Sequence, residues 1–251
     1  MHCLPLSPIL EVCCGSLASA IAAQEGGAPR VELCANLYEG GTTPSNGILE
    51  LAREKLGIKI NVLVRPRGSD FVYNKDEMEI IRRDVVKCKE LEIDGVVIGF
   101  LTTNGDVDVE KTTEIVELAR PMSVTFHRAF DMCMDPYEAM EALIEIGIDR
   151  ILTSGQKNMA PEGVDLIADL VKKAGDRIII MPGAGLEVEN IADFHSMVGA
   201  KEYHSTLWAE VESVMEFRRS DVYMGGSRHI PEFRWKQTDP KRVKLFLKQL
   251  E

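Results

Sequence analysis

The chain has 251 residues, 45% of them hydrophobic and 27% charged, which is typical of a soluble globular protein with a substantial core. Its formal net charge of −11 disfavours nucleic-acid binding, because an acidic surface repels phosphate backbones. No apolar run approaches the roughly 20 residues of a membrane helix, and residues 1–10 lack the pattern of a secretory signal. We therefore expect a cytoplasmic protein that binds neither nucleic acid nor a membrane.

Short apolar, β-branched runs alternate with longer amphipathic segments, which predicts repeated strand–helix units. The predicted strands are Ile9–Cys14, Arg30–Ala35, Lys59–Arg65, Gly95–Phe100, Ser123–Arg128, Arg150–Gly155, Arg177–Gly183 and Glu202–Thr206. This alternation gives a parallel sheet with helices outside it. Closure of the sheet leaves no free edge, so we predict an α/β protein with a single (β/α)8 TIM-type barrel domain over residues 1–251. An open doubly wound sheet is the alternative.

The segments between the strands are predicted to be amphipathic helices. Asp135 is a suitable N-cap, Pro136 suits the first helical position, and Gly147 is a suitable left-handed stop. The other clear helices are predicted at Asp76–Leu91, Asp108–Ala119, Pro161–Ala174, Glu187–Val198 and Pro240–Leu250. The segment at about 207–237 is too long for a simple loop, and we expect it to pack on one end of the barrel before the last helix.

The first two strands end in the matching triplets Glu11-Val12-Cys13 and Glu32-Leu33-Cys34. Side chains alternate along a strand, and the side facing the helices should be apolar, so both glutamates and both cysteines are predicted to face the barrel interior. Adjacent strands lie roughly 4.8 Å apart, so the two thiols could reach one soft metal ion, Cu(I) or zinc. Alternatively, Cys13 and Cys34 fill the interior as small residues.

Cysteine usage indicates a reducing compartment. The six cysteines are Cys3, Cys13, Cys14, Cys34, Cys88 and Cys133. They are too sparse for a disulfide scaffold, and none forms a C-x-x-C pair. We therefore expect reduced thiols.

Glu11 and Glu32 need explanation, since a buried carboxylate requires a cationic partner or a raised pKa. The arginines and the histidine that follow the third and fifth strands are the candidate partners. One interpretation is a satisfied structural ion network inside the barrel. The other is a partly dry catalytic pocket, with Glu11 or Glu32 as general base and His127 as general acid.

A catalytic pocket of this kind would hold an anion at the carboxyl ends of the strands. The glycine-rich turn after the seventh strand lies where many barrels bind phosphate, and strand-end guanidinium groups would reinforce such a site. The predicted anion-binding residues are Arg65, Arg67, Arg128, Gly183, Gly185, His204 and Ser205. The ligand would be a small phosphorylated or carboxylated metabolite.

Taken together, the strand-end motifs resemble the CutC family, which is named for copper homeostasis. In chain order they read EVC, ELC, EGGTTPS, RPR-G-x-DF (Arg65 to Phe71), TFHRAFD, ILTSG, MPGAG and EYH, and the resemblance runs from about Leu10 to the C-terminus. It implies a TIM-type barrel, cytoplasmic copper handling, Cu(I) binding by Cys13 and Cys34, and a homo-oligomer. Two departures are visible: Ala184 stands where many relatives have a glycine, and Ser205-Thr206 stands where relatives often carry a cysteine.

Two functions are therefore open. The first is a copper homeostasis protein of the CutC type that binds Cu(I) through Cys13 and Cys34. The alternative is a TIM-barrel enzyme that acts on a small anionic metabolite at the C-terminal mouth of the barrel.

Overall fold

The computed structural model describes residues 8–219, 221–225 and 230–251, so Cys3 lies outside the described residues. Eight parallel strands surround a common interior, in the order β7-β6-β5-β4-β3-β2-β1-β8. They are β1 (Ile9–Cys14), β2 (Arg30–Leu33), β3 (Lys59–Leu63), β4 (Gly95–Ile98), β5 (Ser123–Phe126), β6 (Arg150–Thr153), β7 (Ile179–Pro182) and β8 (Glu202–Ser205). All the predicted strands are present, and the predicted (β/α)8 barrel is confirmed.

The barrel closes where β7 meets β8, through a single bridge between Gly183 and His204. A glycine suits this position because a Cβ atom on Gly183 would lie 2.6 Å from Leu152 Cδ1 and 3.1 Å from His204 Cβ, so both side chains would have to shift. The absence of a side chain therefore lets β8 approach the end of β7 and seat His204 in the interior.

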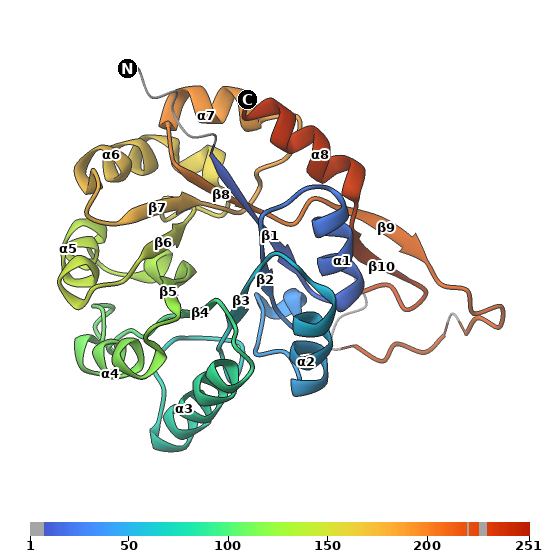
Figure 1. Ribbon diagram of the computed structural model, residues 1–251, viewed down its shortest axis with the longest axis horizontal. Helices are drawn as coiled ribbons and strands as arrows, with labels where there is room; N and C mark the ends of the chain where they lie inside the picture. Colours follow the sequence, from blue (N-terminus) through green and yellow to red (C-terminus); the bar gives the residue numbers. More distant parts are fainter. Residues whose placement is uncertain (1–7, 220, 226–229) are drawn as a thin grey trace.

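A ring of helices surrounds the strands (Figure 1). They are α1 (Leu17–Glu25), α2 (Asn46–Lys55), α3 (Lys75–Glu90), α4 (Val109–Ala119), α5 (Pro136–Ile146), α6 (Val164–Ala174), α7 (Ile191–Val198) and α8 (Pro240–Gln249), with 3-10 turns η1 (Leu37–Glu39), η2 (Arg128–Met132) and η3 (Ala160–Gly163). The predicted limits of α5 are confirmed: the Asp135 side chain accepts hydrogen bonds from two backbone N–H groups, and Gly147 ends the helix at φ 86°. None of the described helices is long and apolar enough to cross a membrane.

The side chains of each strand alternate between two environments. In β1, Leu10, Val12 and Cys14 belong to the large apolar core between strands and helices, and all three are fully buried. Cys13 instead belongs to a separate small cluster inside the barrel. The predicted alternation is therefore correct, and it directs polar side chains into the barrel.

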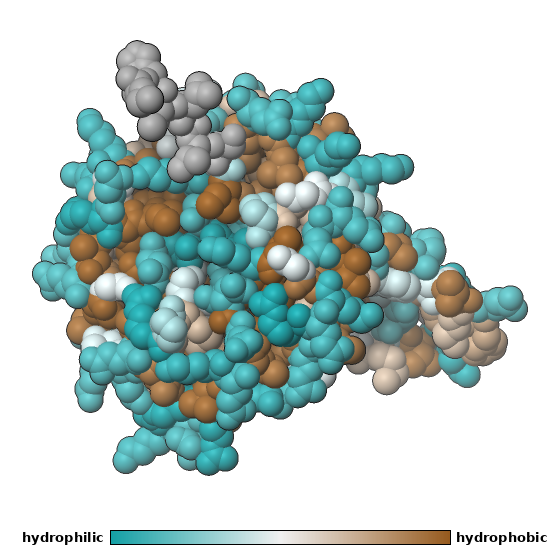
Figure 2. Space-filling view, viewed as in Figure 1, coloured by the Kyte–Doolittle hydropathy of each residue, from teal (hydrophilic) through white to brown (hydrophobic). Residues whose placement is uncertain are grey.

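After β8 the chain leaves the barrel. β9 (Trp208–Glu212) and β10 (Arg234–Thr238) form an antiparallel pair, and β10 lies against α1, where the Thr238 N–H donates a hydrogen bond of 3.2 Å to Ser19 Oγ. The described residues between β9 and β10, 213–219, 221–225 and 230–233, extend away from the barrel (Figure 1). This arm carries exposed hydrophobic side chains such as Val214, Phe217 and Met224. Figure 2 shows hydrophobic surface, in brown, on the segment that extends to the right.

Candidate functional site

Strand register decides which interior side chains meet. Glu11 pairs across β1 and β2 with Arg30, and Cys13 pairs with Glu32. The two matching triplets are thus staggered by two residues, as the shear of a closed barrel requires. On the other side of β1, Glu11 lies opposite His204 of β8.

The barrel interior near the amino ends of the strands holds a buried ion network. Arg30 Nε donates a 2.7 Å hydrogen bond to Glu11 Oε2, and Arg30 also forms an ion pair with Glu202. Asn61 Nδ2 donates a second 2.7 Å bond to Glu11, and Arg150 Nε donates one of 3.1 Å to Glu202. Burial alone would raise the pKa of Glu11, but the Arg30 guanidinium, with help from His204, lowers it to about 2. Glu11 is therefore a paired carboxylate that is charged at neutral pH.

This network corresponds to the structural interpretation of Glu11. Its guanidinium partner is Arg30, at the start of β2, and none of Arg65, Arg67 and Arg128 forms an ion pair with it. A carboxylate with so low a pKa is a weak base, and it is already hydrogen-bonded on both oxygens.

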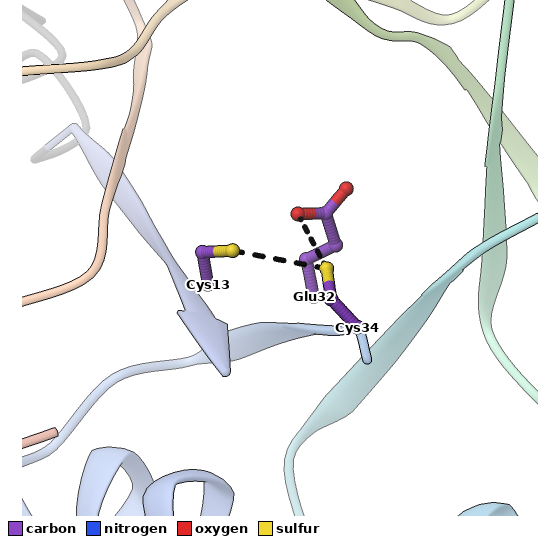
Figure 3. A group of neighbouring side chains, drawn as sticks. All are labelled: Cys13, Glu32 and Cys34. Carbon is purple, nitrogen blue, oxygen red and sulfur yellow. Dashed lines mark hydrogen bonds between the residues drawn. The ribbon is translucent and has the colours of Figure 1, made fainter. Parts of the chain in front are cut away.

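A thiol cluster lies next to this network, towards the carboxyl ends of the strands. Cys13 Sγ and Cys34 Sγ are 3.7 Å apart, and Cys34 Sγ lies 3.3 Å from Glu32 Oε2 (Figure 3). His204 connects the two layers, with Nδ1 2.9 Å from Glu11 Oε1 and Nε2 3.6 Å from Glu32 Oε2. All five side chains are buried, so their charges act on one another with little screening by water.

These contacts shift the ionisation of the cluster in opposite directions. The hydrogen bond from Cys34 outweighs burial and, with the His204 imidazole, lowers the pKa of Cys13 to about 5. The same hydrogen bond and burial raise the pKa of Cys34 well above its usual value. Burial and the Cys13 thiolate raise the pKa of Glu32. Burial opposes protonation of His204, but Cys13 and the two carboxylates outweigh it and raise the pKa of His204. At neutral pH, one thiolate therefore faces an imidazolium.

Cys13, Glu32 and Cys34 together could hold a metal ion, because one ligand atom of each lies within 4.8 Å of the others. The donor set is two soft sulfurs and one carboxylate oxygen, and thiolates select Cu(I) or zinc. With metal–sulfur bonds of about 2.3 Å, a linear two-sulfur site would need sulfurs roughly 4.6 Å apart. The observed 3.7 Å instead suits a bent pair that leaves room for a third ligand.

The cluster opens into a pocket at the carboxyl ends of the strands, with about 270 Å³ of space open to water-sized molecules. The predicted site residues that line it are Cys13, Glu32, Cys34, Arg65, His127, Arg128, Gly185, His204 and Ser205. Glu11, Arg67 and Gly183 do not line it. The structure thus brings most of the predicted site residues together.

Several of these residues already have partners. Arg67 binds Glu77 and Asp70 outside the pocket. Arg128 lines the pocket, but its Nε donates a 2.7 Å hydrogen bond to Asp131, which does not line it. The Gly183 N–H donates to the Thr153 carbonyl, and Ser205 Oγ donates to the Leu186 carbonyl. The Gly183 N–H and the Ser205 hydroxyl are therefore not free to donate a hydrogen bond to an anion.

Sequence reasoning missed the buried network around Glu11. Arg30 and Asn61 contact Glu11 directly, and Glu202 and Arg150 are connected to it through Arg30. Arg30 and Glu202 each precede an inward side chain, Glu32 and His204, by two residues, so strand alternation itself was a usable signal.

The relatives of this chain share one family. The model of the CutC family matches residues 8–209. A CutC family protein of Parabacteroides distasonis is 50% identical over 240 residues, covering 95% of this chain and 99% of that protein. The copper homeostasis protein cutC homolog of Mus musculus is 43% identical over 236 residues, covering 94% and 87%. The crystal structure of CutC from Streptococcus agalactiae has a TM-score of 0.76 at 36% identity, covering 79% of this chain and 98% of that one. The chain belongs to the CutC family.

Proposed function

We propose that this protein is a cytoplasmic copper homeostasis protein that binds Cu(I) through Cys13 and Cys34. The observation that carries the proposal is the 3.7 Å separation of two buried thiols at the wall of an open pocket. The name of the mouse relative, a copper homeostasis protein, supports it.

The cysteines of the described chain differ in their suitability as ligands. Cys14 faces the outer apolar core, where burial raises its pKa. Burial also raises the pKa of Cys88 and of Cys133 to about 12. Cys13 and Cys34 instead lie together on the pocket wall, and Cys13 is already ionised near pH 7. A thiolate is the form that binds metal, so this pair needs to lose fewer protons than any other.

Glu32 gives the pair a third donor. Its carboxyl oxygen adjoins Cys34, and it has no guanidinium partner among the described residues. A cation placed between the sulfurs would lower the pKa of Glu32 and draw its carboxylate into the site. The neighbouring positive charge of His204 opposes cation binding, and loss of its proton would relieve that repulsion.

Competitive titration tests the proposal. Reduced protein is titrated with Cu(I) against a chromogenic Cu(I) chelator, and we expect one ion per chain. The double variant Cys13→Ser, Cys34→Ser should lose this binding, while Cys88→Ser, Cys133→Ser should retain it. The proposal fails if the Cys13, Cys34 double variant competes with the chelator as well as the parent does.

The expectation of a homo-oligomer stays a prediction, which light scattering of the purified chain tests.

The enzyme alternative is less well supported. The ion pair of Glu11 with Arg30 disfavours Glu11 as a general base. Burial lowers the pKa of His127 to about 3, which disfavours it as a cationic acid. Copper binding is therefore the function that this geometry supports best.

A further inference from the structure

Arg65 is a buried cation without a neutralising anion. It follows β3, it is 6% exposed, and no carboxylate of the described chain lies within ion-pair distance of it. Its Nη1 donates to the carbonyls of Glu39 and Gly41 at 3.0 and 2.9 Å, and its Nη2 donates to the Ser69 carbonyl at 2.7 Å. These carbonyls hold the guanidinium in place but leave its net charge uncompensated, which is costly for a buried ion.

The Nε donor of this guanidinium has no acceptor among the described residues. Arg65 Nε is buried and has no hydrogen-bond partner. The neighbouring Tyr73 hydroxyl interacts with this guanidinium without forming a hydrogen bond of normal geometry, and as a neutral group it cannot balance the charge. Buried charges in folded proteins are nearly always paired, so the uncompensated charge of Arg65 indicates a missing anionic partner.

His127 offers a second unused donor in the same pocket. Its Nδ1 accepts a 3.0 Å hydrogen bond from the Ala129 N–H, so the ring is neutral and its proton resides on Nε2. This Nε2–H is buried and has no partner. The position of the ring is well defined, because it packs at 5.0 Å against the Phe71 ring, over which the Arg65 guanidinium also lies at 5.0 Å.

We propose that Arg65 and His127 form a binding site for the oxyanion group, a carboxylate or phosphate, of a small organic molecule that occupies the mouth of the barrel. Both line one pocket, both present only donors, and one of them carries an unbalanced positive charge. A negatively charged acceptor would accept hydrogen bonds from these donors and balance the charge, whereas an amine or a metal cation would do neither. The proposal does not depend on copper binding.

The rest of the pocket indicates what the oxyanion is attached to. Leu37, Leu63, Leu152 and Leu186 line it beside the two donors. About 270 Å³ of space is close to the size of known small-molecule sites and is sufficient for a small metabolite. We therefore expect an oxyanion on a short organic body that is at least partly apolar.

Ligand-induced stabilisation tests the proposal on the full chain without copper. Melting temperature and calorimetric affinity are measured with inorganic phosphate, with acetate and succinate, and with chloride at matched ionic strength. We expect at least one oxyanion to raise the melting temperature above the chloride value, since ligands that bind only the folded state stabilise it. Stronger binding of phosphate would indicate a phosphorylated ligand, and stronger binding of the carboxylates a carboxylated one.

Variants locate the site. Arg65→Met removes the charge, and His127→Asn removes the Nε2 donor while its amide oxygen can still accept from the Ala129 N–H. Each should weaken oxyanion binding about tenfold or more, as expected for loss of a charge-assisted hydrogen bond. Arg67→Met is the matched control, because Arg67 lies nearby in the chain but outside the pocket, and it should bind like the parent. If Arg65→Met does not fold, oxyanion binding by His127→Asn is compared with that of the parent instead.

Two results would overturn the inference. One is that no oxyanion stabilises the parent beyond chloride. The other is that Arg67→Met weakens binding as much as Arg65→Met or His127→Asn does. The double variant Cys13→Ser, Cys34→Ser separates this site from the copper site, because it should still bind the oxyanion.

Discussion

The Sγ atoms of Cys13 and Cys34 lie 3.7 Å apart although their positions on β1 and β2 are not level. Cys13 pairs with Glu32 in the strand register, and Cys34 follows two residues later. The carboxylate therefore lies beside both sulfurs. A level arrangement would have paired the two cysteines directly, whereas the stagger builds a site with three donors.

Alkylation should distinguish Cys13 from the other described cysteines. Since the pKa of Cys13 is lowered to about 5 and those of Cys88 and Cys133 are raised to about 12, Cys13 should be modified first by iodoacetamide at pH 7. Its rate should stay nearly constant between about pH 6.5 and 8.5, which peptide mass spectrometry would follow. An ordinary thiol would instead react about tenfold faster for each pH unit in that range.

Cys34→Ala is the companion variant for this experiment. The hydrogen bond from Cys34 is the largest cause of the lowered pKa of Cys13. Its removal should raise that pKa and slow the alkylation of Cys13 at pH 7. Equal rates in the parent and in Cys34→Ala would show that Cys34 does not stabilise the thiolate.

Copper affinity should rise with pH. The pKa of Cys34 is raised, so its thiol must release a proton when a metal binds, whereas Cys13 is already ionised above about pH 5. Binding should therefore release at least one proton, and the logarithm of the Cu(I) association constant should increase by about one or more per pH unit between about pH 6 and 8. Chelator competition at several pH values measures the slope, and a flat profile would contradict the assigned ionisation states.

The sequence was sufficient to predict the strands and the inward direction of Glu11, Cys13, Glu32 and Cys34, because both follow from short-range periodicity. It was not sufficient to predict that Glu11 meets Arg30, because register between parallel strands depends on the shear of the whole barrel. The neutral state of His127 also lay beyond sequence reasoning, since it depends on a loop N–H placed by the turn after β5.

The position of His127 depends on the absence of a side chain at Gly99. A Cβ atom there would lie 2.3 Å from His127 Cε1 and 2.8 Å from Ala129 Cβ, so Gly99→Ala must displace the imidazole. We expect a loss of about 1–3 kcal/mol in the free energy of unfolding, as for an overpacked interior, together with weaker oxyanion binding. Gly47→Ala is the control, because its Cβ would meet nothing within 4 Å and α2 should gain up to about 1 kcal/mol. Urea unfolding measures both, and equal stability of the parent and Gly99→Ala would contradict the predicted clash.

Arg30 should dominate the stability of the barrel interior. Arg30→Met leaves Glu11 and Glu202 as buried carboxylates with one fewer cation, and we expect it to lower the free energy of unfolding by about 3–5 kcal/mol at pH 7. Arg177→Met removes an exposed ion pair with Glu141, which water screens, and should cost much less stability. Similar losses in the two variants would show that the buried network contributes no more than a surface pair.

The pH dependence of this loss has a definite sign. The pKa of Glu11 falls from 4.5 to about 2 on folding, so its contribution is complete above about pH 4.5 and disappears as the pH falls towards 2. In Arg30→Met the folded-state pKa of Glu11 should rise, because burial is then opposed mainly by His204. Acidification should therefore narrow the stability difference between parent and variant, and the two urea-unfolding curves should converge below about pH 3. A difference that stays constant from pH 7 down to that range would mean that Arg30 acts through packing alone and not through its charge.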